Sequence, residues 1–341
     1  MDIRVISNVS LMRAVRRSTL MQNRMVGLVP TMGALHKGHL DLIRQAAFDN
    51  DTVYVSVYVN PTQFGINEDL TRYPRTWAQD KAKLEGLQAE FRRGGARGRI
   101  QGVFLPDTKE MYPGLPPSSE IDGDGSFVTI TPLARKLEGA SRPVFFRGVA
   151  TVVMKLLHII QPERVYFGQK DIQQTYVIKQ MVRDFQINSE VVVGPTVRED
   201  DGLAMSSRNA FLGERRRKIA LVLLQALREV ERLFAQGERQ KKYLHRGAMD
   251  ALGLVQRQQN ALPPHERARF DIDYISIADV VTLDELEEVK SETGAIVSGA
   301  IKMLPIERRR PGEVMGNGDD EGPVRLIDNI RLDLLTAKLR L

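Results

Sequence analysis

Two histidines, His36 and His39, stand three residues apart on either side of Gly38, and their imidazoles could donate hydrogen bonds to phosphate oxygens. They lie between an apolar run that ends before Pro30 and a segment with helical periodicity. Such strand-to-helix junctions bind phosphate, because free helix N–H groups and the helix dipole favour negative charge. Gly33 and Gly38 would let the backbone approach that phosphate closely.

Two other interpretations of this histidine pair stay open. A metal site would need a third ligand, such as the acid of H-E-x-x-H, and the neighbouring sequence offers none. We therefore expect no metal-ligating residues in the chain. Both histidines could instead be structural residues of a helix cap. The strand, loop and helix around the pair favour the phosphate site.

A second polar segment, Gly168-Gln-Lys-Asp171, also follows a predicted strand and opens a predicted helix that Asp171 could cap. Lys170 could neutralise phosphate charge there, and Gln173 and Gln174 could present amides to the same sheet edge. Taken alone, a loop lysine is most often solvated surface. Its position after a predicted strand favours a phosphate-binding role for this segment.

Two further segments could contact a substrate. Met205-Ser-Ser-Arg-Asn209 offers two hydroxyls and a guanidinium suited to phosphate, although an ordinary capping loop would look the same. In Asn60-Pro-Thr-Gln-Phe64, Gln63 is a neutral hydrogen-bonding group for a hydroxylated substrate, or part of a turn without such a role.

Short β-branched runs alternate with helical patterns up to about residue 195, which predicts βαβ units and a parallel sheet. Expected strands are 25–29, 53–59, 103–105, 165–167 and 191–193, with helices over 40–48, 148–160 and from 171. Helices over 215–234 and 243–259 and strands over 270–277 and 295–303 follow. We predict a Rossmann-like α/β domain over 1–195, and a smaller C-terminal α+β domain over 196–341 after the hinge at Gly194-Pro195. Segments 89–102 and 305–322 look like surface insertions, the second a loop or disordered.

The composition excludes several classes of protein. The 341 residues are 42% hydrophobic and 27% charged, as in globular proteins, and contain no cysteine for a disulfide or catalytic thiol. The apolar runs are too short to span a membrane, and we expect a cytoplasmic protein. The net charge of +6 gathers near 92–99, 215–218 and 308–310. These clusters favour solvated surface, and nucleic-acid binding stays open as an alternative.

Several stretches in this order resemble the pantoate–β-alanine ligase family of the HxGH nucleotidyltransferase superfamily. They are 29–39, 59–64, 73–76, 146–149, 167–174, 205–209 and, more weakly, 325–329. The family commonly has Gly-His before its Phe-Arg-Gly element, where this chain has Val144-Phe145. The segments 90–101 and 305–324 look inserted relative to compact members. Another adenylyl- or cytidylyltransferase of the superfamily is the alternative enzyme.

The resemblance implies a two-step reaction. Pantoate and ATP give pantoyl adenylate and pyrophosphate, and β-alanine then displaces AMP to form pantothenate. It also implies Mg²⁺ with the ATP, a C-terminal domain that closes over the site, and a homodimer that binds neither nucleic acid nor membrane.

The resemblance also implies which residues act. The catalytic residues would be His39, as donor to the leaving group, with His36, Lys170 and Arg208. Gln63, Gln174 and Asn60 would bind pantoate. The ATP-binding residues would be Met32, Gly33, His36, Gly38, His39, Gly168, Lys170, Asp171, Val197, Met205, Ser206, Ser207 and Arg208.

Overall fold

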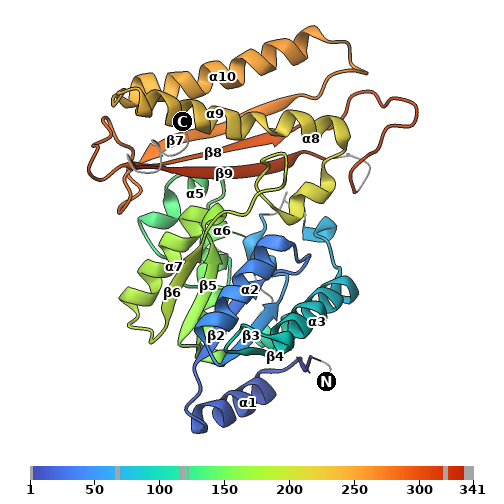
Figure 1. Cartoon of the computed structure of the whole chain (residues 1–341), viewed down its shortest axis with the longest axis vertical. Coiled ribbons are helices and arrows are strands. Elements are labelled where there is room, and N and C mark those ends of the chain that lie inside the picture. The colour runs from blue at the N-terminus through green and yellow to red at the C-terminus, as the bar shows by residue number, and fades with distance from the viewer. Residues whose placement is uncertain are drawn as a thin grey trace. The chain divides into compact units, whose positions relative to one another are not determined.

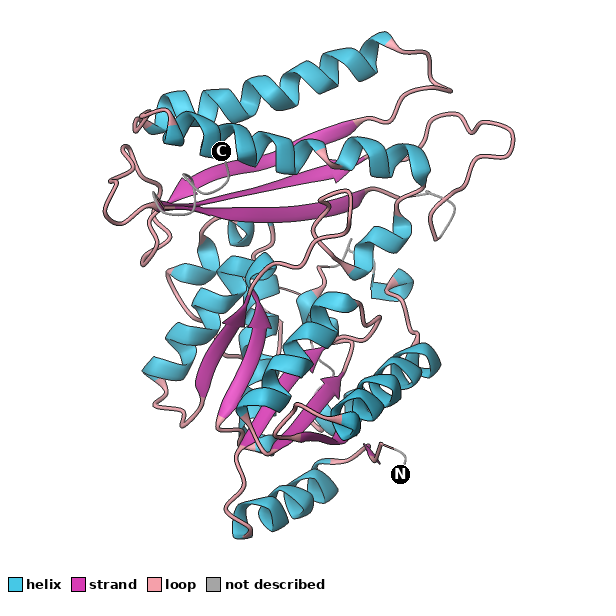
Figure 2. Ribbon diagram, viewed as in Figure 1, coloured by secondary structure: helices cyan, strands magenta, loops and turns pink. Residues whose placement is uncertain are grey.

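The structure is a computed structural model that describes residues 3–65, 70–114, 118, 120, 123–317 and 322–333. The chain divides into two compact units, residues 1–196 and 197–341 (Figures 1 and 2). The division falls one residue beyond the boundary expected after Pro195.

The first unit is built on a parallel sheet in the order β1-β4-β3-β2-β5-β6. Its strands are β1 (Val5–Ile6), β2 (Val26–Thr31), β3 (Thr52–Val57), β4 (Arg99–Phe104), β5 (Arg164–Gly168) and β6 (Glu190–Gly194). The direction of winding reverses between β2 and β5, which pair side by side. In open α/β sheets ligands bind at the carboxyl ends of strands at such a switch point.

Helices cover the sheet of the first unit. They are α1 (Val9–Met21), α2 (Lys37–Asp49), α3 (Trp77–Arg93), α4 (Thr108–Met111), α5 (Glu138–Ser141), α6 (Phe145–Ile160) and α7 (Ile172–Asp184). Short 3₁₀ turns are η1 (Pro61–Gln63), η2 (Leu70–Arg72), η3 (Leu133–Arg135) and η4 (Gln169–Asp171). Every residue of β3 is buried, as expected for a parallel strand with helices on both faces.

The apolar periodicity of α2 and α3 explains one layer of this core. Ile43 and Ala47 of α2 and Leu84 of α3 are fully buried and belong to one apolar cluster with strand residues such as Val29 and Val55. Burying a side chain of this size stabilises a fold by about 1.5–3 kcal/mol. The same packing sets where α2 begins, and therefore where its first turn presents polar groups.

The predicted surface insertion over 89–102 is wrong. Helix α3 continues to Arg93 and strand β4 begins at Arg99, with Phe91 2% and Ile100 3% exposed. Only five residues connect them, including Gly94 and Gly95 with positive φ. Glycines and arginines on the solvent side obscured the helical pattern of α3 and the strand pattern of β4.

The second unit contains an antiparallel sheet in the order β7-β8-β9, with β7 (Phe270–Ala278), β8 (Ala295–Met303) and β9 (Val324–Leu332). Its helices are α8 (Glu214–Ala220), α9 (Val222–Ala235) and α10 (Lys241–Ala261), preceded by the 3₁₀ helix η5 (Ser207–Phe211). Helices α9 and α10 pack together, and their buried faces share one core with the sheet. This is the expected small α+β arrangement.

Two details of this unit differ from the sequence-based expectations. The single helix expected over 215–234 is two helices that meet at Leu221. Strand β9 was not predicted, because its apolar residues alternate with charged ones inside a segment marked only by family resemblance. Residues 305–317 form a loop, which is one of the two forms expected for the segment 305–322. In the part of the chain that is described, no helix has the length and hydropathy needed to cross a membrane.

Candidate active site

The two histidines lie on the first turn of α2, at the carboxyl end of β2. His36 is the N-cap residue, and its backbone N–H donates to Nδ1 of His39 at 3.3 Å. The two rings lie 4.0 Å apart between centroids. Because Nδ1 of His39 accepts a hydrogen bond, the proton of its neutral ring sits on Nε2. His39 can therefore donate from Nε2 to a ligand at the end of the sheet.

The surroundings of His39 keep this ring neutral. Burial lowers its pKa well below 6.5, and the positive charges of His36, Lys170 and Lys83 lower it further. Strand β2 pairs with β5 in parallel, so the loops that follow these two strands lie at the same edge of the sheet. These are the two loops that the strand order brings to the switch point.

A buried carboxylate missed by the sequence analysis holds the loop between β2 and α2. Asp80 of α3 is 1% exposed and accepts the backbone N–H groups of Ala34 at 2.9 Å and Leu35 at 2.7 Å. Its carboxylate also accepts the Thr76 hydroxyl at 3.1 Å. The loop needs this support because Gly33 and Ala34 have φ of 84° and 49°. The sequence signal was an acid placed on the buried face of an amphipathic helix.

Replacing Asp80 by Asn should lower the free energy of unfolding by about 2 kcal/mol, because one backbone donor loses its charged acceptor. It should also slow the enzyme, because the backbone before His36 is no longer fixed. Gln88→Ala is the matched control: Gln88 lies on the same helix and bonds the backbone of Ile100 in β4. Urea unfolding and activity assays should show destabilisation in both variants and a specific loss of activity only in Asp80→Asn. Equal activity in the two would contradict this role.

Asn60 supports Gln63 instead of facing open space. Its side chain is 0% exposed, and Nδ2 donates to Oε1 of Gln63 at 3.0 Å and to the Gly148 carbonyl at 3.1 Å. Oδ1 of Asn60 accepts the Tyr112 hydroxyl at 2.8 Å. With Oε1 of Gln63 engaged in this way, Nε2 is the end of its amide that can donate to a ligand.

Phe145, at the position where this chain departs from the family's Gly-His, packs against an arginine that bonds Gln63. The guanidinium of Arg142 stacks 3.9 Å from the centre of the Phe145 ring, and its Nη2 donates to the Gln63 carbonyl at 3.2 Å. Glu138 balances the charge of Arg142 at 2.9 Å, with both side chains 8% exposed. The aromatic ring in this chain therefore packs a cation that fixes the backbone of Gln63.

The segment after β5 places Lys170 and Asp171 at the sheet edge. Their side chains form an ion pair at 3.6 Å, with exposures of 15% and 45%. Asp171 is the N-cap residue of α7, as predicted, but its side chain makes no capping hydrogen bond. A Cβ on Gly168 would meet no atom within 4 Å, so this glycine leaves open space above the strand.

The two glutamines that follow differ in their surroundings. Gln173 is 4% exposed, and its Nε2 donates to the carbonyls of Leu133 at 2.9 Å and Lys136 at 2.5 Å. The expectation that Gln173 presents its amide to the sheet edge is therefore wrong, because this amide ties α7 to the turn η3. Gln174, one residue on, is half-buried.

The segment 205–209 belongs to the second unit and opens η5. The Ser206 hydroxyl accepts the Arg208 backbone N–H at 3.2 Å, so Ser206 caps this turn. Asn209 is 9% exposed and donates to Oε1 of Glu199 at 2.7 Å and to the Ala204 carbonyl at 3.0 Å. Ser207, Arg208, Met205 and Val197 are half-buried.

Some cations of two of the basic clusters that left nucleic-acid binding open are paired with acidic side chains of the chain itself. Cations near 97 and 217 meet carboxylates within 3 Å, which places their charge in local pairs. The pairs are Arg97–Asp51, Arg217–Glu199, Arg217–Asp201 and Lys218–Glu214.

Fold and site together define a Rossmann-like α/β enzyme with histidines and a lysine at the switch point of its sheet. The family model for pantoate–β-alanine ligase matches residues 4–331. The pantothenate synthetase of a Roseiflexus species is 44% identical over 331 residues, 97% of this chain and 100% of that protein. The chain belongs to the pantoate–β-alanine ligase family.

Solved structures agree with this assignment. The pantothenate synthetase of Thermus thermophilus matches with a TM-score of 0.73 and 38% identity, over 96% of this chain and 99% of that chain. The pantoate–β-alanine ligase of Francisella tularensis matches with a TM-score of 0.67 and 31% identity, over 96% and 97% of the two chains. That structure is a complex with β,γ-ATP and β-alanine.

Proposed function

We propose that this ligase forms its active site from the loop after β2, the loop after β5 and the residues that open η5. The enzyme condenses pantoate with β-alanine at the expense of ATP and forms pantothenate through pantoyl adenylate. The observation that carries the site assignment is the neutral His39 ring, held by the His36 backbone and lying within the field of Lys170. The F. tularensis relative, solved with β,γ-ATP and β-alanine, supports ATP and β-alanine as substrates of this chain.

The first step needs charge stabilisation more than proton transfer. A pantoate carboxylate with an ordinary pKa near 4 is ionised at pH 7 and attacks the α-phosphorus of ATP directly. One P–O bond forms as the bond to the β-phosphate oxygen breaks, and pyrophosphate leaves. Lys170 and Arg208 neutralise the negative charge, while His36 and His39 donate hydrogen bonds to the phosphate oxygens. His39 acts here as a neutral donor through Nε2–H.

Gln63 and Gln174 hold pantoate in this proposal. Nε2 of Gln63 donates to a pantoate oxygen because Asn60 occupies Oε1. Asn60 itself has a supporting role, since its side chain is fully buried. In-line attack requires the carboxylate to sit within about 3–3.5 Å of the phosphorus, which is what such paired amides can fix.

The other predicted site residues bind the nucleotide in this proposal. Open space at Gly168 leaves room for ATP above β5. Backbone, hydroxyl and carboxyl groups of the other predicted residues complete the contacts: Met32, Gly33, Gly38, Asp171, Val197, Met205, Ser206 and Ser207.

In the second step the free amine of β-alanine attacks the adenylate carbonyl, a C–N bond forms, and AMP leaves with the former carboxylate oxygen. Closure of the second unit over the site would keep water from the reactive adenylate.

Mg²⁺ would enter bound to the phosphate oxygens of ATP. Within the described residues no cluster of His, Asp and Glu forms a metal site by itself, and Asp171 is the carboxylate among the predicted ATP-binding residues. We also propose a cytoplasmic homodimer, which light scattering after gel filtration would test.

Release of pyrophosphate and AMP tests the proposed function. Enzyme with ATP and pantoate should release pyrophosphate up to about one equivalent, and AMP should accumulate only when β-alanine is added. Nicotinate mononucleotide in place of pantoate is the control for a related nucleotidyltransferase and should release none. Turnover with nicotinate mononucleotide but not with pantoate would overturn the proposal.

A further inference from the structure

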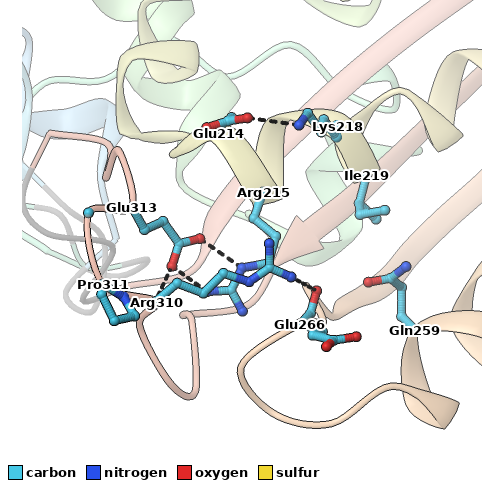
Figure 3. A pocket seen from close by; sticks show the side chains of 10 residues that line it. Glu214, Arg215, Lys218, Ile219, Gln259, Glu266, Arg310, Pro311 and Glu313 are labelled. Carbon is cyan, nitrogen blue, oxygen red and sulfur yellow. Dashed lines mark hydrogen bonds and ion pairs between the residues drawn. The ribbon is translucent and has the colours of Figure 1, made fainter.

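The loop 305–317 of the second unit, whose role the sequence leaves open, packs against α8. A cavity of about 290 Å³ lies between this loop, α8 and the end of α10 (Figure 3). Arg215, Arg310 and Glu313 line it. The cavity offers a ligand little, because the guanidinium of Arg215 is already engaged by carbonyl and carboxylate groups of the chain. The cluster therefore points to a connection within the protein.

An almost fully buried ion pair anchors the loop. Arg215 is paired with both carboxylate oxygens of Glu313, and the two side chains are 8% and 7% exposed. Arg215 also donates to the Arg308 carbonyl at 3.1 Å, within the same loop. Breaking a buried pair by removing one partner leaves an uncompensated charge, so this anchor resists displacement.

Beyond this anchor, the loop backbone lies directly on the end of η5. The Asn317 N–H donates to the Ala210 carbonyl at 2.8 Å, and the Glu214 N–H to the Val314 carbonyl at 3.1 Å. A Cβ on Gly316 would lie 2.2 Å from the Phe211 carbonyl oxygen, a separation that real Cβ atoms do not adopt. Only glycine permits this approach.

A second arginine ties the same end of η5 to the strand that follows the loop. Arg216 is 1% exposed, and its Nη2 donates to the Phe211 carbonyl at 2.5 Å. Its Nη1 donates to the Gly322 carbonyl at 3.0 Å, next to β9. Arg215 thus holds the loop 305–317, and its neighbour Arg216 connects the end of η5 to Gly322, just before β9.

We propose that the loop 305–317 positions η5, and through it Ser206, Ser207 and Arg208, for binding ATP. The proposal rests on the function proposed above, because those three residues act on ATP only if that assignment holds. Glu313 and Gly316 are then positioning residues that touch no substrate. Loosening the loop should weaken ATP binding without changing the pantoate site, which lies on the first unit.

Glu313→Gln tests this role, with Glu307→Gln as the matched control. Glu307 lies in the same loop but pairs with Arg267 and Arg269, away from η5. In steady-state pyrophosphate release with ATP, pantoate and β-alanine, Glu313→Gln should raise KM for ATP roughly tenfold or more, because small misplacements of contacting groups are costly. KM for pantoate should not change, and Glu307→Gln should match the wild type in both constants. If Glu313 only stabilised the fold, Glu313→Gln would not raise KM for ATP while leaving KM for pantoate unchanged.

Gly316→Ala provides a second route if Glu313→Gln does not fold. Its added methyl forces the loop and η5 apart without removing a charge, and should raise KM for ATP in the same way. Folded Glu313→Gln or Gly316→Ala protein with wild-type KM for ATP would overturn the proposal. Absence of pyrophosphate release by the wild type would instead reject the proposed function. In that case the affinities of Glu313→Gln and Glu307→Gln for ATP can be compared by calorimetry. Equal affinities would reject the positioning role.

Discussion

Lys170→Met should lower the rate of pantoate-dependent pyrophosphate release by about a hundredfold or more, the usual loss when a group that stabilises transition-state charge is removed. The side chain of Lys170 is 15% exposed at the end of β5, and its charge acts on His39 across the switch point. Methionine keeps the length and most of the volume of lysine. The effect should appear in the first step, which single-turnover measurements with ATP and pantoate isolate.

Lys179→Met is the matched control for this variant. Lys179 is an exposed lysine on α7, the helix that follows Lys170, so its loss removes the same charge from the next element of the chain. It should leave the single-turnover rate within about threefold of the wild type, since exposed charges contribute little. If Lys170→Met also stayed within threefold, Lys170 would not stabilise the reacting phosphates.

His39→Ala should reduce the same rate by about a hundredfold or more, because Nε2–H no longer donates to the leaving phosphate. His39→Gln, which can still present an amide N–H, should recover part of that loss. His158→Ala is the control, since His158 is exposed on α6. A His39→Ala enzyme with near wild-type single-turnover rates would contradict the assigned role.

The neutral state of His39 also predicts a pH dependence of stability. Its pKa in the folded protein lies well below 6.5, so the unfolded chain binds more protons than the folded chain as the pH falls below that value. His39 therefore costs no stability above pH 6.5 and reduces stability progressively below it. Urea unfolding between pH 5.5 and 7.5 should show a shallower pH dependence for His39→Ala than for the wild type. Identical slopes would mean that the pKa of His39 is the same in the folded and unfolded protein, which would contradict the lowered value.

The elements that carry the site could be predicted because each combines a local pattern with a clear boundary. Strand β2 and helix α2 stand out through buried apolar residues on either side of a polar loop. The positions of His36, His39 and Lys170 follow from them, because neighbouring parallel strands end at one sheet edge.

The groups that support these residues could not be predicted, because they come from distant parts of the chain. Asp80 reaches the loop before His36 from α3, and Glu313 reaches Arg215 across nearly a hundred residues. A charged residue on a helix is taken for a surface residue until its partner is known. For the same reason the sequence did not predict β9, whose charged residues interrupt its apolar ones. Gln173 was likewise predicted to face the site, although its amide bonds η3.

Isotope transfer from pantoate to AMP shows whether the reaction passes through pantoyl adenylate. Pantoate with ¹⁸O in its carboxylate should pass one labelled oxygen to AMP, because that oxygen attacks the α-phosphorus and leaves with AMP when β-alanine adds. Mass spectrometry of the AMP should therefore show one ¹⁸O for each pantothenate formed. Unlabelled AMP, or label found in inorganic phosphate with ADP as the product, would contradict an adenylate and the proposed arrangement of the site.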